Sequence, residues 1–364
     1  MKADRREFVA MSAGFVATSL LHPALSTAQP ETAPPGRKKI IIDTDPGVDD
    51  AFALLLAMSS PEFDLLAVTA VAGNVPIEVT LPNALRLVEI AGRSDIPVAR
   101  GAAAPLTRKL VDAAYAHGNN GLAGVEFPAP RLRPTAEPAS ALIGRLVRAH
   151  PGEITIIGIG PLTNIALALR ESPDLASDVC EIVLMGGSLS GGNVTPSAEF
   201  NFYVDPEAAS IVFDAGIPIR MVGLDVTRQV ALKKEHIDAL QAGRGPVSEA
   251  AARIATAVMA MYRRQQEEGN PHLHDPLAVS AMLSPNILTF EDYRVEIETA
   301  GTLTAGESVG WRRAPVHFSA PVRNGPGQAL DQATPFRANA KVATGVNPEA
   351  FFNLLIPRLT QSRA

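Results

Sequence analysis

Short apolar runs alternate with helix-like segments from residue 39 to residue 224, and this alternation restricts the fold more than any other feature of the sequence. The apolar runs are expected to be strands, at 39–42, 65–71, 97–101, 153–158, 181–185 and 219–224. Helices are expected between them, at 51–58, 79–91, 139–150, 164–170 and 206–215. Continuously apolar strands that alternate with helices predict an α/β fold, a mostly parallel open sheet with helices on both faces in a Rossmann-like arrangement.

Four carboxylates gather where the first expected strand meets the first helix. Residues 43–50 read DTDPGVDD, in which Pro-Gly predicts a turn and the last two acids open the helix. No Lys or Arg occurs between residues 40 and 85, so nothing nearby in sequence neutralises carboxylates that raise one another's pKa. The positive end of the helix offsets only about 0.3–1 kcal/mol for each charge. A bound cation would supply the rest, and carboxylate oxygens as ligands predict Ca²⁺ or Mg²⁺.

Polar residues also follow other expected strands. Asn74 comes after 65–71, the turn 160–164 after 153–158, and a Gly-Gly step after 181–185. The carboxyl ends of parallel strands meet at one edge of a sheet, where α/β folds bind their ligands. We therefore expect these residues and the four acids to line a single site.

Composition narrows the possible partners. The chain of 364 residues has a formal net charge of −6 and a sequence pI of about 5.7. This charge gives no basic surface for nucleic acid, so we expect a small-molecule partner and no nucleic acid. The single cysteine, Cys180, excludes an intrachain disulfide and is expected to be buried in its apolar run.

The first 28 residues are expected to be a targeting segment. Arg5 and Arg6 precede an apolar stretch at 8–25, and residues 26–28 provide the small side chains of a signal-peptidase site. This combination predicts a twin-arginine (Tat) signal peptide at 1–28. The protein is then expected to be periplasmic or secreted, without a stable membrane anchor after processing. The Pro-rich segment 29–38 is expected to be a connector.

Three segments resemble motifs of the inosine/uridine-type nucleoside hydrolases, Ca²⁺-dependent enzymes that cleave the N-glycosidic bond of ribonucleosides. Residues 43–51 (DTDPGVDDA) resemble the N-terminal signature of that family. Residues 193–201 (NVTPSAEFN) resemble its ribose-binding loop, and residues 270–278 (NPHLHDPLA) resemble its C-terminal His-Asp-Pro motif. The resemblance implies a nucleoside hydrolase fold with one catalytic domain at 39–360, and by analogy a dimer or tetramer.

The resemblance assigns the metal and the proton transfers. It implies that Ca²⁺ is held by Asp45, Asp50, Asp275 and the backbone carbonyl of Ile159, a position where the family commonly has Thr. Because Ile159 contributes a carbonyl, its different side chain should be tolerated. Asp45 is the implied base that takes a proton from the metal-held water. His274 is our candidate for the general acid, because an unperturbed pKa of about 6.5 suits proton donation near neutrality.

The resemblance also assigns the ribose. Asp49, Asn74, Asn193, Glu199 and Asn201 would hydrogen-bond the sugar oxygens, which suits amide and carboxylate groups. Read alone, two Asn residues in a loop are turn formers more often than ligands.

The loop 117–124 (HGNNGLAG) resembles a flexible family loop near the base, with Ala123 where an Asp is usual. His117 is therefore a further candidate for contact with the nucleobase. An ordinary surface loop is the alternative, and these residues do not distinguish a purine from a pyrimidine.

Two other classes of protein fit part of the pattern. Asp43 and Asp45 after an apolar strand also fit a haloacid-dehalogenase-type phosphatase with Asp43 as nucleophile, although Gly47 stands where that signature has Thr or Val. An exported protein that binds a nucleoside without cleaving it would share the same motifs.

Overall fold

The computed structural model describes residues 36–265, 269–312, 323–324, 328–329 and 337–361. The expected signal peptide at 1–28 and most of the expected connector at 29–38 lie outside these residues. From Arg37 onward the chain forms one compact unit. Its first strand begins at Lys38, and the Arg37 side chain donates to the carbonyl of Phe63.

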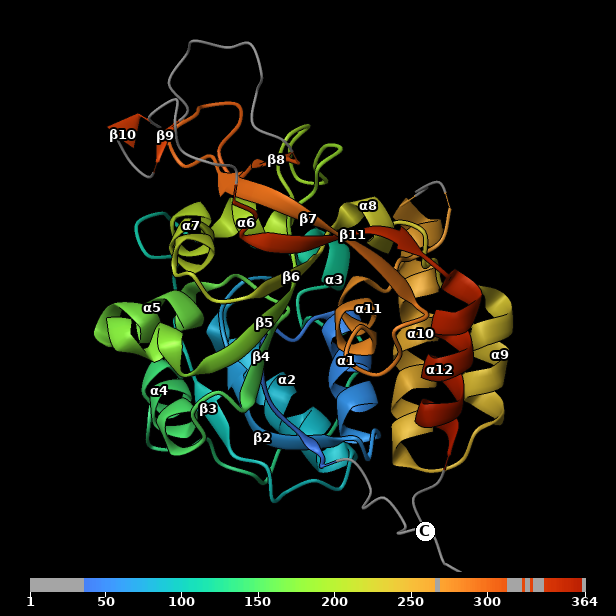
Figure 1. Cartoon of the computed structure of the whole chain (residues 1–364). Coiled ribbons are helices and arrows are strands. Elements are labelled where there is room, and N and C mark those ends of the chain that lie inside the picture. The colour runs from blue at the N-terminus through green and yellow to red at the C-terminus, as the bar shows by residue number, and fades with distance from the viewer. Residues whose placement is uncertain (1–35, 266–268, 313–322, 325–327, 330–336, 362–364) are drawn as a thin grey trace, which may run out of the picture. The chain divides into compact units, whose positions relative to one another are not determined.

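A nine-stranded sheet runs through this unit in the order β3-β2-β1-β4-β5-β6-β11-β7-β8 (Figure 1). Its strands are β1 Lys38–Thr44, β2 Phe63–Ala70, β3 Val98–Arg100, β4 Ile154–Gly158, β5 Val179–Met185, β6 Ile219–Val222, β7 Leu288–Ile297, β8 Ser308–Trp311 and β11 Ala340–Val346. All pairs from β3 to β11 are parallel, whereas β7 pairs antiparallel with β11 and β8. The predicted fold class is confirmed. The remaining strands, β9 Arg323–Asn324 and β10 Gln328–Ala329, form a separate antiparallel pair.

Helices cover both faces of the sheet. They are α1 Val48–Met58, α2 Ile77–Ile90, α3 Ala114–His117, α4 Ala139–Ala149, α5 Thr163–Glu171, α6 Phe200–Val204, α7 Pro206–Asp214, α8 Leu224–Thr227, α9 Lys234–Ala242, α10 Pro246–Gln265, α11 His274–Ser280 and α12 Pro348–Thr360, with a short 3₁₀ turn at Pro173–Ser177. In Figure 1, α4, α5 and α7 lie on one side and α1, α10, α11 and α12 on the other. No described helix is both long and apolar enough to span a bilayer.

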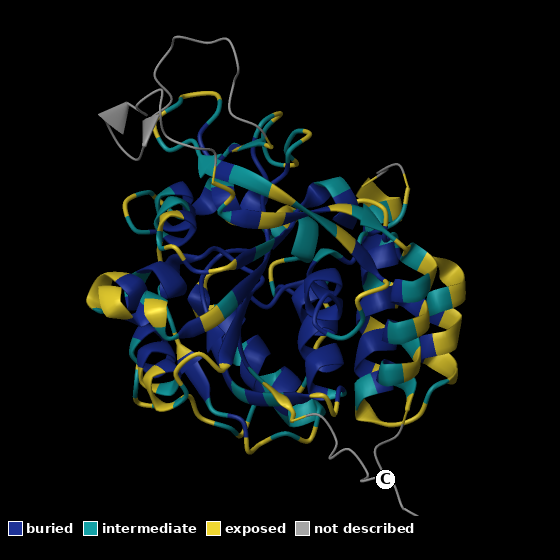
Figure 2. Cartoon of the chain, in the orientation of Figure 1, coloured by how far each residue is buried: buried dark blue, intermediate teal, exposed yellow. Residues whose placement is uncertain are grey.

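Alternate side chains of β1 enter the apolar cores on the two faces of the sheet. Ile40 and Ile42 belong to the apolar core under α1, α10 and α12, whereas Ile41 belongs to the core under α4, α5 and α7. Successive side chains of a strand point to opposite faces, so a run of isoleucines serves both cores. Figure 2 shows the central strands and α1 buried while the outer face of α9 is exposed.

The sheet order reverses between β1 and β4. β2 and β3 extend the sheet on one side of β1, and β4, β5 and β6 extend it on the other. Such a reversal leaves a crevice at the carboxyl ends of the two strands, the usual ligand site of open α/β sheets. The acid turn follows β1 directly, so the topology places the carboxylates in that crevice.

Some local expectations are wrong. Cys180 is exposed, because it lies near the start of β5, where only part of the strand is covered. The helix expected at 79–91 begins earlier, at Ile77, so Pro82 lies inside α2. Periodicity assigned no element after residue 224, and β7, β8 and β11 complete the sheet there.

Candidate active site

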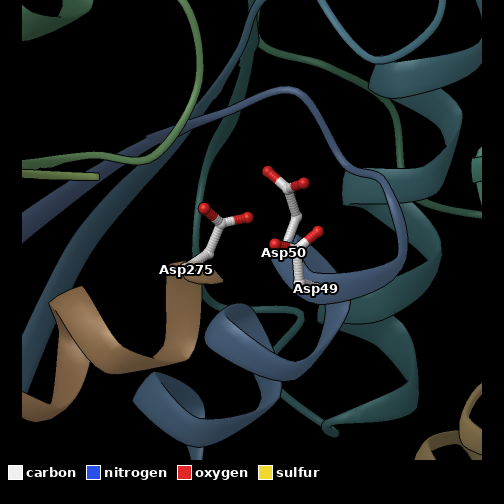
Figure 3. A group of neighbouring side chains, drawn as sticks. All are labelled: Asp49, Asp50 and Asp275. Carbon is white, nitrogen blue, oxygen red and sulfur yellow. The ribbon is translucent and has the colours of Figure 1, made fainter. Parts of the chain in front are cut away.

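Three carboxylates from two distant parts of the chain converge at the carboxyl edge of the sheet. Asp49 and Asp50 lie in the first turn of α1, and Asp275 is the second residue of α11 (Figure 3). One carboxylate oxygen from each lies within 4.8 Å of those of the other two, and all three residues are buried. Among the ion pairs of the described residues, none joins a Lys or Arg to this carboxylate cluster.

Backbone and side-chain donors hold the carboxylates in place. Asp50 accepts hydrogen bonds from Thr44 Oγ1 at 2.6 Å, Gly47 N at 3.0 Å and Asn74 Nδ2 at 2.9 Å. Asn74 also donates its backbone N–H to Asp45 Oδ2 at 2.6 Å. The other oxygen of Asp45, Oδ1, is buried and accepts no hydrogen bond from the residues that the structure describes. An orphaned carboxylate oxygen beside the cluster fits a cation ligand, since buried acceptors are otherwise paired.

The electrostatics of the cluster also fit a cation. Burial, and then the charge of Asp50, raises the pKa of Asp45 well above its usual 3.8. Burial and the charges of Asp49 and Asp50 do the same to the pKa of Asp275. Burial raises the pKa of Asp49 to about 6 and also raises the pKa of Asp50. A divalent cation would compensate this shared penalty, so the residues present suit the metal that this site predicts.

The fourth acid of the turn has a different environment. Asp43 is fully buried in β1, where its Oδ1 accepts hydrogen bonds from Thr69 Oγ1 at 2.5 Å and Asn164 Nδ2 at 2.7 Å. Burial raises the pKa of Asp43 to about 7. Asp43 does not line the cavity described next, so its position does not suit the nucleophile of a phosphatase.

A cavity of about 380 Å³ lies against the carboxylate cluster, within the size range of small-molecule sites. Most of the candidate residues line it, namely Asp49, Asn74, His117, Ile159, Asn193, Glu199, Asn201, His274 and Asp275. Asp45 and Asp50 are fully buried and do not line it. The structure thus gathers the predicted residues at one site, with Asp45 and Asp50 behind the cavity wall.

The expected sugar loop is held by its own polar side chains. Glu199 caps α6, accepting from the backbone N–H groups of Gly187, Asn201 and Phe202. Burial nevertheless raises the pKa of Glu199 to about 7. Asn193 Oδ1 accepts from the backbone N–H of Phe200 at 3.0 Å. These contacts orient the loop, and they use part of the hydrogen-bonding capacity that we assigned to ribose.

Asn201 links the ends of two strands. Its Nδ2 donates to the carbonyl of Met185 at 3.0 Å and, at 3.4 Å, to the carbonyl of Ile159. The Ile159 carbonyl, our expected metal ligand, therefore accepts a hydrogen bond from the sugar loop. A carbonyl oxygen has two lone pairs, so it retains one for a ligand.

Two imidazoles, those of His117 and His274, line the cavity. His117 Nδ1 accepts the backbone N–H of Val48 at 3.1 Å and lies 3.9 Å from Asp49 Oδ1. Burial lowers the pKa of His117 to about 4. Burial and nearby positive groups lower the pKa of His274 to about 3, so our expectation of an unperturbed value is wrong. Both rings are neutral at physiological pH.

His274 and Asp275 are the first two residues of α11. In a helix, neighbours are separated by about 100°. They therefore point differently, His274 into the cavity and Asp275 also toward the acids of α1.

The loop that carries His117 is tightly hydrogen-bonded. Asn120 Oδ1 accepts from the backbone of Leu122 and Gly124. Asn83, on α2, donates to the carbonyls of Asn120 at 2.9 Å and Pro46 at 3.2 Å. The same side chain thus ties the loop to the acid turn.

Sequence reasoning missed several residues of the site. Thr227 contacts His274 from behind the cavity lining. Further residues line the cavity itself, namely Phe200, Arg228, Val258, Tyr262 and His272. Thr227 follows the strand that we expected at 219–224. Polar residues that come directly after expected strands were our other site candidates, and the same criterion would have identified Thr227.

The fold and the site together define a metal-dependent hydrolase of nucleosides. The chain belongs to the inosine-uridine preferring nucleoside hydrolase family, whose sequence model matches residues 40–353. The enzyme is therefore a nucleoside N-ribohydrolase, which cleaves the N-glycosidic bond of ribonucleosides.

Individual relatives agree with this assignment. The chain is 42% identical over 324 residues to a pyrimidine-specific ribonucleoside hydrolase RihA of Shewanella sp. (strain ANA-3), covering 88% of this chain and 96% of that protein. It is 43% identical to the RihA protein of Photobacterium profundum, covering 88% of this chain and 98% of the relative.

Solved structures agree as well. The plant nucleoside hydrolase PpNRh1 has a TM-score of 0.81 and 34% identity, covering 89% of this chain and 99% of that one. A purine-preferring ribonucleoside hydrolase from Gardnerella vaginalis has a TM-score of 0.77 and 31% identity, covering 89% and 98% respectively.

Proposed function

We propose that this enzyme hydrolyses pyrimidine ribonucleosides to ribose and free base. The observation that carries the proposal is the buried, uncompensated cluster of Asp49, Asp50 and Asp275 against a cavity lined by sugar-binding side-chain types. Preference for pyrimidines is supported by the names of the relatives that are 42–43% identical along almost their whole length. The alternative of a protein that binds a nucleoside without cleaving it is disfavoured because the matching family is one of nucleoside hydrolases.

The metal in this proposal is Ca²⁺. Asp50 and Asp275 would hold it, together with the orphaned Oδ1 of Asp45 and the carbonyl of Ile159, because hard oxygen donors suit this ion. When bound, the cation supplies a fixed positive charge that orients and polarises oxygen groups at the site.

The chain's own residues perform the remaining tasks. Asp45 takes the proton of the attacking water as an ionised carboxylate, the form that a cation bound beside it favours. Asp49, Asn74, Asn193, Glu199 and Asn201 hold the ribose. His274 and His117 meet the nucleobase with N–H groups, because the base gains electrons as the glycosidic bond breaks.

A nucleoside panel tests the reaction and the base preference. Purified enzyme is incubated with uridine, cytidine, inosine and adenosine, and the release of reducing sugar is measured. We expect release from uridine and cytidine to be faster. No sugar from any nucleoside would overturn the function, and faster release from inosine would overturn only the preference.

A second comparison tests the role of His274. His274→Ala should slow hydrolysis of uridine by ~10²–10⁴-fold, the typical contribution of assisted proton or charge transfer. It should largely spare p-nitrophenyl riboside, whose phenolate leaves without help. Asp45→Asn should slow both substrates, since both need the same activated water. Equal losses for His274→Ala on both substrates would assign it to ligand or metal positioning.

We also propose export by the Tat route and assembly into a homo-oligomer, a dimer or tetramer. The twin arginines Arg5 and Arg6 support export because the receptor reads guanidinium pairs, so their replacement by Lys should retain the precursor in the cytoplasm. Unchanged appearance outside the inner membrane would refute Tat export. Light scattering of the purified enzyme tests the oligomer, and a monomer would refute it.

A further inference from the structure

The imidazole of His274 has a single described partner on its inner side. Its Nδ1 lies 2.7 Å from Oγ1 of Thr227, the last residue of α8. Thr227 is fully buried. Its hydroxyl makes no other hydrogen bond within the described part of the chain, so the contact with His274 accounts for its whole polar environment.

The direction of this hydrogen bond follows from counting donors. A hydroxyl carries one hydrogen, and a neutral imidazole carries one hydrogen on either Nδ1 or Nε2. If Nδ1 carried it, the buried hydroxyl hydrogen of Thr227 would have no acceptor among the described residues. Buried donors without acceptors are rare because they cost about 1–3 kcal/mol. The hydroxyl therefore donates to Nδ1, and the ring keeps its proton on Nε2.

The turn that carries Thr227 is itself fixed. Asp225 accepts from the backbone N–H of Leu189 at 2.9 Å and from Ser190 Oγ at 2.6 Å. The guanidinium of Arg228 donates to the carbonyl of Gly192, just before the sugar loop. α8 is therefore held by the chain that follows β5, and Thr227 cannot follow a rotating ring.

His117 shows the same arrangement by independent geometry. Its Nδ1 accepts a backbone N–H, that of Val48, and a backbone N–H can only donate. The neutral ring of His117 consequently carries its proton on Nε2 as well. In both rings the protein occupies Nδ1 and leaves Nε2 for another partner.

We propose that Thr227 is a positioning residue, whose hydroxyl fixes His274 in the Nε2–H tautomer so that the ring donates a hydrogen bond to the departing base. The inference rests on the proposed role of His274 in nucleoside hydrolysis. It adds that the imidazole of His274 is a neutral N–H donor in one fixed tautomer, and that the imidazole of His117 provides a second donor of the same kind.

The tautomer is tested without reference to activity. In full-length enzyme with ¹⁵N-labelled histidine, NMR at neutral pH should show a protonated Nε2 and an unprotonated Nδ1 for His274, assigned by the loss of its signals in His274→Ala. A protonated Nδ1 in the wild-type enzyme would overturn the proposal.

Kinetics test the consequence. Thr227→Val keeps the shape of the side chain and removes the hydroxyl, and it should lower kcat for uridine by about 10- to 100-fold, as loss of an orienting partner typically does. It should change p-nitrophenyl riboside hydrolysis little. Thr227→Ser should restore the uridine rate. In the double variant with His274→Ala, Thr227→Val should cost nothing further.

Controls separate positioning from folding. Thr155→Val removes another buried threonine hydroxyl, that of Thr155 in β4, which lies 3.4 Å from Oε1 of Glu181 in β5 and outside the cavity. This substitution should leave both rates unchanged. An unchanged uridine rate in Thr227→Val would refute positioning, as would equal losses on both substrates. If wild-type enzyme releases no sugar from any nucleoside, the proposed function fails, whereas the NMR result still decides the tautomer.

Discussion

The substitution Gly160→Ala tests whether the carboxylate of Asp45 must lie where the structure places it. A methyl group on Gly160 would lie 2.5 Å from Oδ1 and 2.9 Å from Cγ of Asp45. These distances are about 1 Å short of ordinary van der Waals contact. The carboxylate has no room to move away, because Gly73 packs closely against its other oxygen, Oδ2. This packing is so close that a Cβ built on Gly73 would lie only 2.1 Å from Oδ2. Asp45 therefore lies between two glycines.

The expected losses follow from this geometry. Displacement of a catalytic group by about 1 Å typically costs 10²-fold in rate, so kcat for uridine and for p-nitrophenyl riboside should both fall by about that factor. Overpacking of a buried site costs about 1–3 kcal/mol in the free energy of unfolding. The assays are initial rates on both substrates, urea denaturation and elemental analysis for bound metal.

The matched control is Gly144→Ala. Gly144 lies in α4, where a methyl group would meet only Arg148 Nη1, at 3.7 Å. Replacing a helical Gly by Ala should stabilise the fold by about 0.5–1 kcal/mol and leave both rates unchanged. Wild-type rates in Gly160→Ala would refute the reasoning that the position of Asp45 limits catalysis.

Two further predictions concern the metal and pH. Asp50→Ala should abolish both the bound ion and activity, whereas Asp43→Asn should lose less, and elemental analysis of active enzyme that finds no alkaline-earth ion would contradict a Ca²⁺ site. Burial raises the pKa of six acids at the site: Asp43 and Glu199 to about 7, Asp49 to about 6, and Asp45, Asp50 and Asp275 above their usual value. It lowers the pKa of three imidazoles there, His117, His272 and His274. Because the acids outnumber the imidazoles, the folded ion-free protein binds more protons than the unfolded chain between about pH 4 and pH 7. Its free energy of unfolding should therefore fall as pH rises through that range. Urea titrations in EDTA at pH 5 and pH 8 measure this, and greater stability at pH 8 would refute it.

The first sheet strands were predictable because each is apolar on both faces. The run Ile40–Ile42 shows why, since every residue of it enters one of the two cores. β7 was not predictable in the same way, because most of its residues are only partly buried and its sequence is rich in charge. The antiparallel end of the sheet depends on pairing across distant segments, which local periodicity does not encode.

The candidate site was predictable where motif residues lie together in sequence, as in the acid turn. Long-range contacts decided the rest. The burial of His274, and not its residue type, lowers its pKa, and its partner Thr227 lies on another element. Likewise, Asp43 and Asp45 are two positions apart, yet only tertiary contacts show that Thr69 and Asn164 bind the former.

The carboxylate cluster joins the first helix of the fold to a segment made much later. Asp50 and Asp275 are 225 positions apart in the chain, so an ion bound to both would act as a removable cross-link across most of the molecule. Closing a loop of that length is worth about 5 kcal/mol against the unfolded chain if the link behaves like a covalent one. During synthesis the acid turn leaves the ribosome well before its partner does. The metal site therefore lacks Asp275 until the last third of the chain has folded against the acid turn.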